Sequence, residues 1–216
     1  MPTVQTNHVT GYLNSDIAYT LIQPESSTTN QLAILLPGMG YTTEAPLFRY
    51  TIGLLLEAGY GVVEVHYRYQ DKKYACSDIE EAVRVDVGRV IDSIRSTHKH
   101  TSYLFVAKSL GTIALADQVK RDIFKQAKSI WLTPLVHLDD VYETLLTSHH
   151  DALVLMGTDD RFYVADRLNE IQSNPKIETI LKPSLNHSLE YADDSLQSIL
   201  VMHELMKAVK RFIYTT

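Results

Sequence analysis

The sequence predicts an α/β protein in which helices cover both faces of a mostly parallel central sheet. Short apolar runs with the length of strands alternate with longer segments whose apolar residues recur at three- and four-residue steps. The run Leu32–Leu36 is apolar without a break, which is typical of a strand buried on both faces. Strands that alternate with helices in this way indicate a parallel sheet between two helical layers.

The first half of the chain is expected to hold five strands. Pro24 ends the second of them and Pro37 ends the third. In chain order, the expected strands cover Val9–Leu13 at the sheet edge, Ala18–Gln23, Leu32–Leu36, Gly61–Tyr67 and Tyr103–Lys108.

Two helices are expected between these strands. The first covers about Glu44–Ala58, because Thr43 can cap its start and Pro46 fits its first turn. The second covers Ser77–Ile94, where Ser77 and Glu80 form a capping box.

The second half continues the alternation. A helix of small residues, Thr112–Ala116, follows the fifth strand. The remaining strands are expected at Ser129–Leu132, Ala152–Met156 and Ile177–Leu181, and the helices near Leu138–Leu146, Val164–Ile171 and Ser195–Phe212. The terminal helix is expected to bury one stripe made of Leu196, Ile199, Leu200, Leu205, Val209 and Phe212.

Length and composition limit the possible functions. A chain of 216 residues with 45% hydrophobic content fits one globular domain over residues 1–216. Its net charge of −6, with acids and bases mixed, gives no electrostatic reason to expect nucleic acid or an anionic membrane as a partner. The start lacks the pattern of a signal peptide, and the single Cys76 permits no internal disulfide. We therefore expect a cytoplasmic protein.

The fifth strand runs directly into a turn with a serine at its centre. The residues two before and two after Ser109 are Ala107 and Gly111, and both are small. A sharp turn between a strand and a helix needs small residues at these positions, and it exposes the serine hydroxyl above the sheet. Ser109 is therefore a candidate nucleophile.

A serine nucleophile needs a base and an acid that orients the base. Loops at the carboxyl ends of parallel strands lie along one edge of the sheet, where ligands bind. Of the histidines that follow Ser109, His187 is in a loop after the last strand and at this edge, so we expect it to be the base. Asp159 and Asp160 both follow the preceding strand, and their spacing does not distinguish them as the acid.

Two loops offer backbone N–H groups for a negatively charged oxygen. Leu110 follows the nucleophile at the start of a helix, and Met39 is in the Gly-rich loop Pro37–Gly40 after a buried strand. Donors of this kind stabilise the oxyanion that forms when a serine attacks a carbonyl carbon. We expect no metal site, because the His-rich stretches lack the spacing of zinc ligands.

These motifs resemble those of the α/β-hydrolase family over residues 17–214. Leu35–Gly40 resembles the family's oxyanion loop with Pro37 in place of histidine, and Ala107–Gly111 resembles its Gly-x-Ser-x-Gly elbow. Gly157–Asp160 resembles its acid turn and Asn186–Leu189 its base loop. The resemblance implies an α/β-hydrolase fold, a Ser–Asp–His order of catalytic residues, and Asp160 rather than Asp159 as the acid.

The implied activity is that of a serine hydrolase that needs no cofactor. An ester of a small molecule is the expected substrate, with thioesters and small amides as further options. Acyl transfer or hydrolysis of a carbon–carbon bond on the same residues, and a binding protein without turnover, are the alternatives. Only Val136–Asp151 separates two core strands, so the resemblance is to small members without a cap and with an open cleft. The candidate cleft residues are Tyr41, Tyr67, Tyr69, Leu135, Phe162 and Tyr163.

Overall fold

A single mixed sheet runs through the computed structural model, which describes residues 2–24, 30–70, 78–97 and 100–215. Its eight strands follow the order β1-β2-β4-β3-β5-β6-β7-β8 in the described residues. The β1–β2 and β2–β4 pairs are antiparallel and all the others are parallel. The strands are β1 (Thr3–Thr10), β2 (Asp16–Gln23), β3 (Gln31–Leu36), β4 (Gly61–His66), β5 (Ser102–Lys108), β6 (Lys128–Leu132), β7 (Ala152–Gly157) and β8 (Ile177–Lys182).

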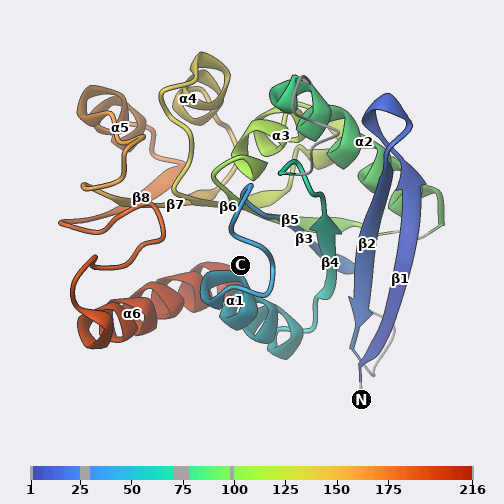
Figure 1. Ribbon diagram of the computed structural model, residues 1–216, viewed down its shortest axis with the longest axis horizontal. Coiled ribbons are helices and arrows are strands. Elements are labelled where there is room, and N and C mark those ends of the chain that lie inside the picture. The colour runs from blue at the N-terminus through green and yellow to red at the C-terminus, as the bar shows by residue number, and fades with distance from the viewer. Residues whose placement is uncertain (1, 25–29, 71–77, 98–99, 216) are drawn as a thin grey trace.

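Helices cover both faces of the sheet, as expected (Figure 1). α1 and α6 pack together on one face, and α2, α3, α4 and α5 follow one another across the other. The α-helices are α1 (Pro46–Glu57), α2 (Ile79–Thr97), α3 (Gly111–Gln118), α4 (Asp139–Leu146), α5 (Ala165–Gln172) and α6 (Ser195–Tyr214), and the short 3-10 helices are η1 (Tyr12–Asn14) and η3 (Asp122–Phe124). The predicted α/β architecture is confirmed.

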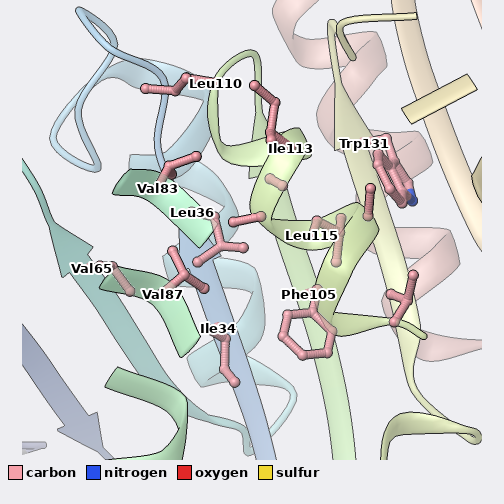
Figure 2. Packing of buried hydrophobic residues seen from close by; sticks show 14 of the residues in the cluster. Ile34, Leu36, Val65, Val83, Val87, Phe105, Leu110, Ile113, Leu115 and Trp131 are labelled. Carbon is pink, nitrogen blue, oxygen red and sulfur yellow. The ribbon is translucent and has the colours of Figure 1, made fainter. Parts of the chain in front are cut away.

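The central strands are apolar throughout because each contributes side chains to both cores. In β3, Ile34 and Leu36 pack with α2 and α3, whereas Leu35 packs on the opposite face toward α1 and α6. Figure 2 shows the first core, where Ile34 and Leu36 lie beside Val87 of α2 and near Phe105 of β5. The apolar run of β3 is uninterrupted because the strand is buried on both faces, as the sequence suggested.

The ends of the chain's early elements differ from expectation. β1 begins at Thr3 rather than near Val9, because it is held by backbone pairing with β2 while most of its side chains are exposed and carry no apolar pattern. α1 has Ala45 rather than Thr43 at its N-cap. Ser77 of the expected capping box lies outside the described residues, and Asp78 Oδ1 accepts a hydrogen bond from the Glu81 N–H instead (3.1 Å).

The expected apolar stripe of α6 is only half right. Leu205, Val209 and Phe212 are buried, but the three earlier members of the stripe are exposed: Leu196 by 76%, Ile199 by 65% and Leu200 by 58%. At that end the helix buries Ser198, Val201 and Met202. The first turns of α6 carry apolar residues on nearly every face. The sequence therefore did not show which face of these turns packs against the core.

No helix among the described residues has both the length and the apolar character needed to cross a membrane.

Candidate active site

Ser109 is at the sharp turn between β5 and α3. Its backbone has φ 50°, in the left-handed region that residues with a side chain seldom adopt. The turn fits tightly under β3, since a β-carbon on Gly111 would stand 2.1 Å from the Leu36 carbonyl oxygen. The Ser109 N–H is held by the carbonyl oxygen of Leu132 at the end of β6 (3.1 Å). Glycine at position 111 is thus required by the close approach of the start of α3 to the end of β3.

His187 links Ser109 to a buried carboxylate. The ring Nε2 of His187 is 2.8 Å from the Ser109 Oγ, and its Nδ1 is 2.7 Å from Asp160 Oδ2. The Asp160 side chain is fully buried, whereas the His187 side chain is 25% exposed. A buried carboxylate fixes the ring's orientation and favours the tautomer with a proton on Nδ1, which leaves Nε2 free to accept a proton from serine.

The two neighbouring aspartates have different environments. Asp160 Oδ1 accepts a hydrogen bond from the Phe162 N–H (2.9 Å) while Oδ2 contacts His187. Asp159 is exposed, and its Oδ1 accepts a hydrogen bond from the hydroxyl of Thr158 (3.3 Å). The spacing left these residues equivalent, and the structure brings only Asp160 to the histidine.

The His187 loop is closed by its own side chains and backbone. Asn186 Oδ1 accepts hydrogen bonds from the Ser188 N–H (2.8 Å) and the Glu190 N–H (3.3 Å). The Asn186 N–H in turn donates to the Glu190 carbonyl oxygen (3.0 Å). This tight turn presents His187 at the carboxyl edge of the sheet.

Met39 and Leu110 both have a backbone N–H without a protein acceptor in the part of the chain that the structure describes. The Gly38 N–H closes the Pro37–Tyr41 loop by donating to the Tyr41 carbonyl oxygen (3.1 Å). Gly38 is close to the serine, because a β-carbon there would lie 3.3 Å from the Ser109 Cβ. The loop that carries Met39 therefore lies against Ser109, as an oxyanion site requires.

Lys108, which sequence reasoning did not single out, lies directly beneath this arrangement. It is 1% exposed, and its Nζ donates to the Thr133 Oγ1 (2.7 Å) and to the His187 carbonyl oxygen (2.6 Å). Burial lowers the pKa of Lys108 to about 7, against the opposing effects of the Asp160 and Glu190 charges. A lysine that ends an otherwise apolar strand was the signal in the sequence.

Solved structures with the same architecture identify the fold. An esterase from Pyrococcus furiosus matches with a TM-score of 0.75 at 15% identity, over 98% of this chain and 92% of its own. An α/β serine hydrolase without a lid from Xanthomonas campestris matches with a TM-score of 0.70 at 16% identity, over 99% of this chain and 96% of its own. The chain has the α/β-hydrolase fold. An α/β serine hydrolase homologue from Coxiella burnetii gives a TM-score of 0.72 at 15% identity, covering 96% of each chain.

No protein-family model and no curated protein sequence matches the chain. Between β6 and β7 this α/β-hydrolase fold carries no lid. Between β6 and β7, α4 is the one helix, and it packs against α3 and α5 as part of the helical layer. The expected fold and the absence of a cap between these strands are therefore confirmed.

Three of the expected cleft residues form or support the Pro37–Tyr41 loop. Tyr67 is buried, its hydroxyl donates to the Pro37 carbonyl oxygen, and its ring stacks on Tyr69 at 4.8 Å. Tyr41 is half-buried, and its hydroxyl accepts from the Leu47 N–H (3.1 Å). Desolvation raises the pKa of Tyr41 to about 12, so its hydroxyl stays protonated at neutral pH.

The other three expected cleft residues are in the loops that follow β6 and β7. The Phe162 ring meets the His187 ring edge to face at 5.1 Å and stacks on His137 at 4.8 Å. Tyr163 is half-buried beside it, and Leu135 is buried with 7% exposure. Phe162 thus packs directly against the histidine that contacts Ser109.

A separate groove of about 810 Å³ lies between α1 and α6. Met202, Met206 and Tyr191 contribute to its walls, and Asn186 and Glu190 bring the His187 loop to its rim. None of the expected cleft residues discussed above lines it. Among the described residues, no group of three or more His, Cys, Asp or Glu side chains is placed to hold a metal ion.

Proposed function

We propose that the protein is a serine hydrolase that cleaves an ester of a small molecule through a covalent acyl-enzyme. The observation that carries this proposal is the pair of hydrogen bonds from Ser109 Oγ to His187 Nε2 (2.8 Å) and from His187 Nδ1 to Asp160 Oδ2 (2.7 Å). Serine alone is a weak nucleophile, and this arrangement provides the base and the orienting carboxylate that it needs.

The reaction begins when the Ser109 oxygen attacks the carbonyl carbon and His187 Nε2 takes the serine proton. The resulting oxyanion accepts hydrogen bonds from the N–H groups of Met39 and Leu110, which have no protein acceptor within the described chain. The proton on His187 then passes to the departing alcohol as the bond between the carbonyl carbon and the alcohol oxygen breaks. Water, activated by His187, attacks the acyl-enzyme and releases the acid together with free Ser109.

Esters are the proposed substrate class, with thioesters and small amides as further candidates. An α/β hydrolase without a cap between β6 and β7 leaves the surface around Ser109 open, which suits a small or exposed acyl group. The similarity to a protein named as an esterase and to one named as a serine hydrolase without a lid supports this choice. No cofactor takes part in the proposed reaction.

Intact-mass spectrometry after exposure to a fluorophosphonate tests the proposal. We expect one adduct on the wild-type protein and none on Ser109→Ala, because only an activated serine attacks this reagent. We then expect hydrolysis of short-chain p-nitrophenyl esters by the wild-type protein alone. A folded wild-type protein that forms no adduct would contradict a hydrolytic function and favour a binding protein, and faster transfer to an added alcohol than to water would indicate an acyltransferase.

A further inference from the structure

Lys108 is the most deeply buried cation of the described residues. It is the one lysine or arginine among them that is buried, at 1% exposure, and it directly precedes Ser109. No carboxylate of the described chain lies within 4.0 Å of its Nζ to form an ion pair. Burying an ammonium group without such a partner is costly, so a lysine at this position needs an explanation other than stability.

The N–H bonds of the Lys108 side chain and its contact with the Tyr41 ring link its nitrogen to three different loops at the carboxyl edge of the sheet. One donates to the Thr133 Oγ1 after β6 (2.7 Å), and one donates to the His187 carbonyl oxygen after β8 (2.6 Å). The third side of the group faces the ring of Tyr41 after β3, whose centroid is 4.7 Å from Nζ. Lys108 therefore connects the loop of the base, the loop of Met39 and the end of β6 at one point.

Each of these contacts bears on the geometry of the reaction. His187 is held from two directions, with Asp160 fixing its ring and Lys108 fixing its backbone. Tyr41 closes the loop of Met39 by accepting the Gly38 N–H (3.1 Å). Thr133 has φ 44° and follows Leu132, whose carbonyl oxygen holds the Ser109 N–H (3.1 Å). A shift of the ammonium group would move the base and the oxyanion loop relative to the serine.

We propose that Lys108 is a positioning residue of the hydrolytic reaction, whose side-chain nitrogen holds the His187 loop and the Pro37–Tyr41 loop in register with Ser109. The inference rests on the proposed function. Lys108 does not touch the reacting atoms in this arrangement. Its effect passes through His187 and Tyr41, and so it should appear in the rate of the chemical step more than in substrate binding.

The test compares Lys108→Met with Lys182→Met in p-nitrophenyl ester hydrolysis and in the rate of fluorophosphonate labelling. Methionine has nearly the length of lysine and fills the same space without donating hydrogen bonds. Lys182 makes a matched control, since it is on β8, which leads to the His187 loop, but its Nζ pairs with Glu204 at the surface (2.6 Å). We expect Lys108→Met to lower kcat and the labelling rate about 10- to 100-fold with little change in KM, as for a small misplacement of reacting groups. Lys182→Met should retain the wild-type kcat.

Circular dichroism melting shows whether each variant is folded. A folded Lys108→Met protein with the wild-type kcat and labelling rate would overturn the proposal.

If Lys108→Met does not fold, Thr133→Val provides the test instead, because this variant removes one acceptor of the lysine's hydrogen bonds and keeps the shape of the side chain. We expect Thr133→Val to lower kcat about fivefold, which corresponds to one ordinary hydrogen bond, and an unchanged kcat would overturn the proposal. A wild-type protein that neither labels nor hydrolyses esters would instead contradict the proposed function, and the role of Lys108 would fall with it.

Discussion

The carbonyl oxygen of Leu36 occupies the space in which a side chain at Gly111 would begin, with 2.1 Å between that oxygen and an ideal β-carbon. The contact joins the end of β3 to the start of α3 beneath the serine turn. Neither backbone can retreat without breaking the β3–β5 ladder, in which Leu36 pairs with Ala107.

Gly111→Ala should therefore destabilise the protein strongly. We expect the free energy of unfolding to fall by at least about 3 kcal/mol, the upper end of the usual cost of overpacking, because the clash is with backbone. Gly53→Ala is the matched control, since nothing lies within 4 Å of a β-carbon there and the site is an exposed position inside α1. Gly53→Ala should raise the free energy of unfolding by about 0.5–1 kcal/mol. Urea unfolding of both variants measures the difference, and equal effects would contradict the contact.

Asp160→Asn should remove most of the activity and Asp159→Asn should leave it nearly intact. An asparagine in place of Asp160 would still fill the buried site but would no longer favour the His187 tautomer that accepts the serine proton. We expect kcat to fall by about three to four orders of magnitude for Asp160→Asn, as for loss of the acid in a serine triad. Asp159 is exposed and does not contact His187. The measurement is kcat for ester hydrolysis by the two folded variants. An equal loss of kcat in both would count against Asp160 as the acid.

Tyr69→Phe should reduce stability while keeping the ring that stacks on Tyr67. The Tyr69 hydroxyl donates to Oδ2 of Asp86 in α2 (2.6 Å), and Asp86 is fully buried. Losing a hydrogen bond to a charged group costs about 1.5–3 kcal/mol. Tyr50→Phe is the control, because Tyr50 is 59% exposed and should change stability by less than about 0.5 kcal/mol. Chemical denaturation of both variants tests the pair, and matching midpoints would show that the bond contributes nothing.

The stability of the wild-type protein should rise with pH relative to Lys108→Met. The pKa of Lys108 is about 7 in the folded protein against an ordinary value of 10.5, so between these values the unfolded chain binds a proton that the folded chain lacks. Below pH 7 both states are protonated, and the full cost of burying the charge is present. Between these two pKa values, the unfolding free energy of the wild type should increase relative to that of Lys108→Met by up to about 1.4 kcal/mol per pH unit.

Asp160, Glu190 and His187 lie near position 108 in both proteins, and the pKa of Tyr41 is about 12, so the difference between the two proteins reports on the lysine. Urea unfolding of folded wild type and variant at pH 6, 7, 8 and 9 provides the measurement. Parallel stability curves across this range would show that Lys108 keeps its ordinary pKa.

The fold could be predicted from the sequence because its strands are buried on two faces. An uninterrupted run such as Leu32–Leu36 has one stable placement, in the middle of a covered sheet, and this placement fixes which edge carries the loops. α6 was harder, since Leu196, Ile199 and Leu200 are apolar and yet exposed. Periodicity identifies a helix with apolar residues, but it does not identify the face that another element covers.

The site residues differ in how strongly the chain order constrains them. Ser109 is marked by the small residues of its turn, and His187 by its place after the last strand. Asp159 and Asp160 are adjacent, and only the direction of the turn after β7 distinguishes them. Lys108 was missed because its role depends on three loops that meet only in the folded sheet, and none of these contacts is local in sequence.

The hydrogen bond between Ser109 and His187 spans 78 residues of the chain and two intervening strands, β6 and β7. The serine therefore becomes reactive only after β5, β6, β7 and β8 have paired side by side in the sheet. During refolding from urea, fluorophosphonate labelling should then appear only when this half of the sheet is complete. The rate of labelling would therefore lag behind the recovery of secondary structure.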